Sequence, residues 1–150
     1  MRHFLTVVHP ALWILTVLLV PALWAPAPAA APDQPKATLQ AFMDAGASRD
    51  VGALEKMLHA DFRVVFNIVG KPGVTVLDRA GYLGLMKAGK IGGKPMSPIW
   101  HHSLVAEDMA QIRATSTRAD GRFEQVFTLV RIEGRWQLVA DSTILYPKAP

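Results

Sequence analysis

The last third of the chain constrains the fold most strongly, because apolar and polar residues alternate there over four short segments. The dipeptides Asp120-Gly121 and Glu133-Gly134 separate the last three segments, and glycine accepts the positive φ that tight hairpin turns require. Residue periodicity predicts strands at 99–106, 109–118, 122–132 and 135–145. Together they predict an antiparallel meander.

Two helical patterns come first in the folded part. Apolar residues recur at helical spacing over 39–46, where Asp33 or Thr38 can cap the start, and a second pattern begins at the N-cap residue Asp50. We expect this second helix to include His59 in its last turn, where a protonated ring interacts favourably with the helix dipole.

The hydrophobic period then changes from that of a helix to that of a strand. Residues 62–69 and 74–77 read as a hairpin, and Asp78 can cap a third helix that runs to about Lys87. Glycines and prolines over 89–98 predict a flexible loop, which could serve as a lid. This order of elements predicts an α+β domain in which helices cover one face of a curved mixed sheet, and the open side of the curve makes a pocket.

The first 31 residues have the layout of an export signal. Arg2 precedes an apolar run over 11–20, and small residues at 29–31 suit cleavage. The alternative is a retained membrane anchor over 4–25. Both alternatives place the folded part outside the cytoplasm, either periplasmic or secreted, and only the second attaches it to a membrane.

Composition narrows the function classes further. A short linker at 32–35 is expected to lead into one domain at 36–147 of the 150-residue chain. The absence of cysteine excludes disulfides, thiolate nucleophiles and thiolate metal ligands. The formal net charge is +4, but Lys and Arg are scattered rather than clustered, so we predict no nucleic-acid partner.

Three segments carry a resemblance to a known superfamily. They are the link from Ala47 to Leu54, the sequence His59-Ala60-Asp61-Phe62, and the terminal run from Glu133 to Val139. In this order they resemble the nuclear transport factor 2-like superfamily, with its exported putative lumazine-binding and SnoaL-like branches closest, over about residues 36–145. The resemblance implies a cone-shaped α+β fold, with three N-terminal helices packed on a curved mixed, mainly antiparallel sheet of about six strands. It also implies a homodimer, because the superfamily frequently pairs sheet to sheet.

The same resemblance bears on catalysis. Ketosteroid isomerases of this superfamily need an aspartate base, together with a tyrosine and a protonated aspartate that hold an oxyanion. The superfamily pattern places Phe42 at the tyrosine, Phe66 at the base and Phe127 near the oxyanion aspartate. Phenylalanine neither donates nor accepts a proton, and a slip of one residue would bring only Val65 or Asn67 to the base position. We therefore lean towards a protein that is not an enzyme.

No motif predicts a metal or cofactor. Neighbouring residues on a strand point to opposite faces, so at most one of His101 and His102 can face a pocket. The glycine-rich stretch 89–93 lacks the Lys-Ser/Thr and helix of a phosphate-binding loop.

Several polar residues remain as pocket candidates, each with a structural alternative. His102 can contact a ligand or lie on the surface, and Arg113 can bind an anion on the concave face or face water. Gln125 shares a strand face with apolar residues and therefore needs a hydrogen bond there. Tyr82 and Trp136 are core or rim aromatics first and stacking surfaces second. The candidate pocket residues are Phe42, Phe62, Phe66, Tyr82, His102, Arg113, Gln125, Phe127 and Trp136.

These observations lead to two hypotheses. The first is an exported, non-catalytic domain that binds a small apolar or aromatic molecule in its cup or acts as a dimeric interaction module. The alternative is an isomerase or cyclase in which a pocket histidine works with Gln125 or Arg113.

Overall fold

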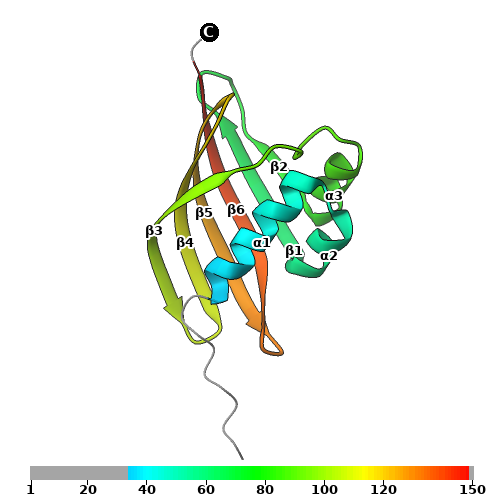
Figure 1. The fold of residues 1–150 in the computed structure, drawn as a ribbon, viewed down its shortest axis with the longest axis vertical. Helices are drawn as coiled ribbons and strands as arrows, with labels where there is room; N and C mark the ends of the chain where they lie inside the picture. Colours follow the sequence, from blue (N-terminus) through cyan, green and yellow to red (C-terminus); the bar gives the residue numbers. More distant parts are fainter. Residues whose placement is uncertain (1–33, 149–150) are drawn as a thin grey trace, which may run out of the picture.

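A computed structural model describes residues 34–148 of the chain (Figure 1). The expected signal peptide at 1–31 and the alternative anchor at 4–25 lie outside these residues. Within residues 34–148, no helix is long and apolar enough to cross a membrane. The elements are α1 (Gln34–Ser48), α2 (Val51–Met57), β1 (Leu58–Ile68), β2 (Thr75–Asp78), α3 (Arg79–Lys87), β3 (Ser97–Ala106), β4 (Met109–Arg118), β5 (Gly121–Ile132) and β6 (Arg135–Pro147).

The six strands form one mixed sheet in the order β2-β1-β6-β5-β4-β3. Only β1 and β6 pair in parallel, and the other neighbours are antiparallel. The three helices lie on one side of the sheet, with α1 running across it (Figure 1). We call this side the inner face and the opposite side the outer face. The predicted α+β fold with three helices and six strands is confirmed.

Side-chain caps start two of the helices where the sequence predicted. The Asp50 carboxylate accepts a hydrogen bond from the Ala53 backbone N–H at 2.9 Å, and Asp78 accepts one from the Gly81 N–H at 2.8 Å. Each carboxylate satisfies a backbone donor that has no partner within the first helical turn.

The end of α2 differs from the prediction. The helix stops at Met57, and Leu58 has extended dihedrals of φ −88° and ψ 128°. His59 therefore lies in β1, and the placement of His59 in a helical turn is wrong. The physical reason is that Leu58 pairs with Leu138 of β6 and is buried there, so strand pairing overrides local helix preference.

The start of α1 also differs in detail. This helix begins at Gln34 and so takes in the last two residues of the expected linker. Thr38 lies inside the helix and is not its cap, while Asp33 lies outside the described residues.

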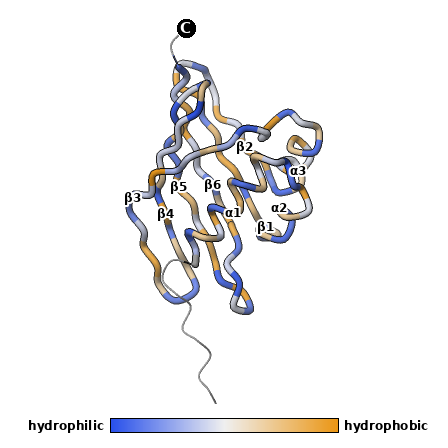
Figure 2. Tube along the Cα trace, in the orientation of Figure 1, coloured by the Kyte–Doolittle hydropathy of each residue, from blue (hydrophilic) through white to orange (hydrophobic). Residues whose placement is uncertain are grey.

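The hydrophobic core lies between the helices and the inner face. Hydrophobic and hydrophilic residues alternate along the strands (Figure 2), which puts one apolar set inward. The largest side chains with almost no exposure are Leu39, Leu54, Phe62, Met86, Ile112, Phe127, Leu129 and Leu138.

A β-bulge in β6 changes this alternation. Leu129 of β5 pairs with Leu138, but Thr128 pairs with Ala140, so Val139 is an extra residue without a partner on β5. Because side chains alternate with a period of two, one extra residue exchanges the inner and outer sets beyond it. Asp141 consequently faces inward.

The segment between α3 and β3 passes over the inner face, where Figure 1 shows it crossing in front of the sheet. The Arg49 guanidinium holds this segment by donating to the backbone carbonyls of Ile91, Gly89 and Gly92 at 3.1, 3.2 and 3.3 Å. The Gly93 N–H also donates to the Gly46 carbonyl at 3.0 Å. This segment is thereby fixed to the end of α1.

Gly92 is required by both conformation and space. Its φ is +68°, and a Cβ atom there would lie 2.5 Å from the Gly46 carbonyl oxygen. We expect Gly92→Ala to lower the free energy of unfolding by about 1–3 kcal/mol, measured by urea unfolding.

Gly84→Ala is the control, because Gly84 lies in α3 with no neighbouring atom within 4 Å of an added Cβ. This change should stabilise the protein by roughly 0.5–1 kcal/mol. Equal effects of the two substitutions would contradict the importance of the Gly92 contact.

Candidate functional site

A cavity of about 250 Å³, open on one side, lies between the inner face, the helices and the segment after α3. This volume is slightly below the roughly 300–1,000 Å³ of typical ligand pockets. Its wall is mainly apolar, and its aromatic and sulfur-containing members are Phe42, Met43, Phe66, Tyr82, Met86, Met96 and Phe123. Such a wall suits a small molecule with an apolar body.

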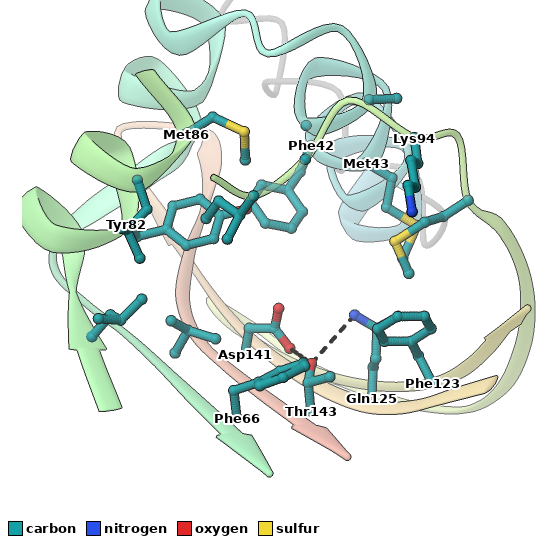
Figure 3. A pocket seen from close by; sticks show the side chains of 18 of the residues that line it. Phe42, Met43, Phe66, Tyr82, Met86, Lys94, Phe123, Gln125, Asp141 and Thr143 are labelled. Carbon is teal, nitrogen blue, oxygen red and sulfur yellow. Dashed lines mark hydrogen bonds between the residues drawn. The ribbon is translucent and has the colours of Figure 1, made fainter. Parts of the chain in front are cut away.

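A chain of hydrogen bonds crosses the sheet at the floor of the cavity, and Figure 3 shows the part that joins Gln125, Thr143 and Asp141. The Ser116 hydroxyl donates to Gln125 Oε1 at 3.2 Å, Gln125 Nε2 donates to Thr143 Oγ1 at 3.4 Å, and Thr143 Oγ1 donates to Asp141 Oδ1 at 2.6 Å. Three strands supply these residues, because β4, β5 and β6 are neighbours in the sheet. These hydrogen bonds give the Gln125 amide the partners that the sequence required, and they end at the Asp141 carboxyl group.

Asp141 is only 6% exposed, and no described Lys, Arg or His forms an ion pair with it. Burial raises the pKa of Asp141 to about 6, although the hydrogen bonds from Thr143 and Gln125 act in the opposite direction. The carboxyl group therefore changes charge near pH 6. Burial, together with the nearby Asp141 charge, also raises the pKa of the Tyr82 phenol, which stays protonated.

Aromatic rings pack together above this floor. The Phe42 and Tyr82 rings stack with centroids 6.1 Å apart, and Phe62 meets the Tyr82 ring edge-on at 5.4 Å. Phe42 also meets Phe127 at 6.5 Å. These contacts fix Phe42 and Tyr82 as rigid parts of the cavity roof (Figure 3).

The structure brings only some of the sequence candidates together. Phe42, Phe66, Tyr82 and Gln125 line the cavity. Phe62 and Phe127 are fully buried in the core and do not line it.

The other candidates lie elsewhere. Trp136 is buried in the core, with the Arg131 guanidinium 5.5 Å from its ring centroid. Arg113 is on the outer face, where it donates to Glu124 at 3.2 Å. His102 is exposed at an irregularity between Trp100 and Ser103 and does not line the cavity.

His101 lies near His102 but is also outside the cavity. It makes a 2.7 Å hydrogen bond with Thr115 on the outer face. The cavity lining thus contains no histidine among residues 34–148.

Sequence reasoning missed Asp141 and Thr143. Strict alternation from Trp136 and Leu138 would have placed Ala140 inward, and the extra residue at 139 reverses that assignment. One signal was available, because an inward Gln125 needs a polar partner on a neighbouring strand, and Thr143 lies directly opposite it.

The described residues contain no group of three or more His, Asp or Glu that could hold a metal ion. The polar groups of the cavity lining include a carboxyl group, an amide, hydroxyls and the cationic side chains of Lys94 and Arg118, all beside a mainly apolar wall.

A family profile described as putative lumazine-binding matches residues 32–142. The chain belongs to this family. Solved structures described as NTF2-like share its fold. No curated protein sequence matches the chain.

Three solved structures show the likeness of fold. An NTF2-like protein of unknown function from Silicibacter pomeroyi has a TM-score of 0.62 at 19% identity, covering 75% of this chain and 92% of that one. An NTF2-like protein from Cytophaga hutchinsonii gives 0.63 at 19%, covering 73% and 93%. A ketosteroid isomerase-like protein from Erwinia carotovora atroseptica gives 0.56 at 18%, covering 78% and 95%. At these identities the likeness shows a shared fold only. The chemistry of the site depends on the residues of this chain.

The raised pKa of Asp141 makes stability depend on pH. The ordinary value is 3.8 and the folded value is about 6, so the folded state binds more protons between them. Stability is highest while the group is protonated in both states, falls as the pH rises above 3.8, and is lowest above about 6. We expect Asp141→Asn to raise the free energy of unfolding at pH 8 by up to about 3 kcal/mol, with a much smaller gain at pH 4.

Urea unfolding at both pH values measures this difference. Asp120→Asn is the control, because desolvation acts to raise the pKa of Asp120 but hydrogen bonds from Arg118 and Lys94 hold it below its ordinary value. Asp120→Asn should not raise the free energy of unfolding at pH 8. A gain from Asp141→Asn that is the same at pH 4 and pH 8 would rule out the buried charge as its cause.

Proposed function

We propose that this domain binds a small, largely apolar or aromatic molecule in its cup, with the Asp141 carboxyl forming a hydrogen bond to it. We also propose that the protein is exported, as its N-terminal sequence predicts. Because the cavity is small, one or two rings suit it better than a large cofactor.

The buried carboxyl group of Asp141 carries the proposal. A carboxylate without a cationic partner is expensive to bury in an apolar wall, and an apolar residue of similar size would cost less stability. A group of this kind at a cavity surface is a recognised mark of a binding site. Its position at the end of a hydrogen-bonded chain fixes its direction, which suits a ligand with a polar group at that end of the cavity.

Binding is favoured over catalysis by the rest of the lining. Phe42 and Phe66 supply no proton donor or acceptor, and neither His101 nor His102 lines the cavity. One observation favours the alternative, an isomerase or cyclase. Asp141 ionises near neutral pH and can act as the base that the sequence hypothesis assigned to a histidine.

The neutral aromatic compound 1-naphthamide tests the binding proposal. We expect it to bind the wild-type protein with a Kd on the order of 0.1 mM, measured by its fluorescence and by thermal shift. Ala47 lines the cavity, so Ala47→Phe should fill it and abolish binding.

Ala41→Phe on the exposed side of the same helix is the control and should bind as the wild type does. Native mass spectrometry of the freshly purified protein adds a direct search for a retained compound. Equal binding by both phenylalanine variants would place the probe outside the cup and count against the proposal.

The outer face supports a second proposal, an interface between two copies of this chain. Val76, Val65 and Val126 are 61%, 39% and 43% exposed and follow one another across the sheet, with Ser142 between the last two. Ile144, 41% exposed, adjoins this row. A row of apolar side chains on the exposed face of a sheet marks an interaction surface.

Charge complementarity favours a second copy as the occupant. Beside the apolar row, the Glu124 carboxylate contacts both the Arg113 and Arg122 guanidinium groups. In a two-fold interface the same patch meets itself, and a patch that carries both signs of charge can pair with its copy.

Val126→Glu should therefore shift the protein towards the monomer, measured by analytical ultracentrifugation. Two copies of the new carboxylate would have to be buried in the interface, which weakens association by about 10-fold or more. Val105→Glu is the control, because Val105 is 40% exposed but pairs with inward-facing Ala110 and so lies off the outer face. A wild-type protein that sediments as a monomer would refute the interface.

A further inference from the structure

The mouth of the cavity carries two cationic side chains that the proposed function leaves unused. Lys94 and Arg118 both belong to the cavity lining, where every other residue except Asp141 is uncharged. Figure 3 shows the Lys94 amine on the same side of the cavity as Phe123 and Gln125, away from Tyr82. The lining is thus divided into a cationic mouth and a floor that ends in a carboxyl group.

Arg118 is placed by β4 and held against an aromatic ring. It follows Ser116 on the inner face by two residues, and its guanidinium carbon lies 4.4 Å from the Phe123 ring centroid. Its side chain is only 18% exposed. A guanidinium stacked on a ring is fixed in orientation, so its free N–H donors point in defined directions.

Both cations share one carboxylate. Arg118 Nε and Nη2 donate to Asp120 at 3.0 and 2.9 Å, and Lys94 Nζ donates to the same group at 3.3 Å. Two positive charges face one negative charge, so the mouth keeps a net positive charge. Because an ammonium has three N–H donors and a guanidinium five, donors remain for another anion.

A structural ion pair explains only part of this arrangement. Arg118 and Asp120 are two residues apart and can stabilise the turn between β4 and β5 by themselves. Lys94 comes from the segment after α3 and is 26 residues from Asp120 in sequence. The Arg49 hydrogen bonds hold this segment in place. The fold therefore brings a second cation to a site that already has its ion pair.

We propose that the natural ligand of the cup is an organic anion, a carboxylate attached to an apolar or aromatic ring. This inference rests on the proposed binding function and adds the ligand class. The ligand carboxylate binds Lys94 and Arg118 at the mouth, and its ring lies between Phe42, Phe66 and Phe123. Asp120 is the internal counter-ion of these cations and shares them with the ligand.

The Asp141 end of the cavity gives the ligand a direction. A second anionic group placed there would be repelled by the buried carboxylate, whereas a hydroxyl, an amide N–H or a ring N–H would donate a hydrogen bond to it.

The test compares 1-naphthoate with 1-naphthamide, which have nearly the same shape and differ in charge. We expect the wild-type protein to bind the acid about 10-fold more tightly than the amide at pH 7 and low salt, with the preference reduced at high salt. Fluorescence titration and calorimetry measure both dissociation constants.

Lys94→Gln should weaken naphthoate binding by about 5- to 10-fold and leave naphthamide binding unchanged, and Arg118→Gln should do the same. Lys90→Gln is the matched control, because Lys90 lies in the same segment, is exposed and does not line the cavity. Lys94 is itself largely exposed, with 58% of its side chain accessible, so its substitution leaves the core intact even if Arg118→Gln impairs folding.

Three results would overturn the inference. Equal binding of acid and amide would leave the cup as a binding site and remove the anion preference. A Lys94→Gln effect that is the same for both probes, or the same as that of Lys90→Gln, would show that the amine does not contact the carboxylate. Binding of neither probe would overturn both this inference and the proposed function.

Discussion

The extra residue in β6 is the constraint on which the site depends. Val139 has no partner on β5, and every residue beyond it changes sides, which turns Asp141 and Thr143 towards the helices. Without this bulge Ala140 and Ser142 would face the cavity, and its floor would have no carboxyl group. One inserted residue thus determines whether the floor of the cavity carries a carboxyl group.

Burying the Asp141 carboxyl group costs folding free energy, and polar side chains on the neighbouring strands reduce this cost. Gln125 and Ser116 continue the hydrogen-bonded chain from Thr143, so each buried polar side chain in it has a partner. The carboxyl group still loses its hydration and has no cation beside it, which is why its pKa rises. The Arg49 hydrogen bonds hold the segment after α3 over the inner face, where Ile91 and Gly92 form part of the cavity wall.

The two ends of the cup differ in chemistry while the middle is apolar. Lys94 and Arg118 stand at the mouth, and Asp141 lies at the floor. The fold is shared with proteins at 15–19% identity, which shows the architecture and no activity. The chemical character of this cavity therefore follows from its own charged groups, and a ligand of the kind we propose would complement both ends.

The sequence by itself determined the elements and their order, because caps and turns act locally. Asp50 and Asp78 start their helices through bonds within three residues, and Gly134 permits its turn by its own φ of +76°. The sequence also required a partner for Gln125. Only the tertiary structure decided that His59 belongs to a strand and that Asp141 faces inward. Both depend on pairing with distant strands, whose register and bulges follow from packing across the sheet and cannot be read from local periodicity.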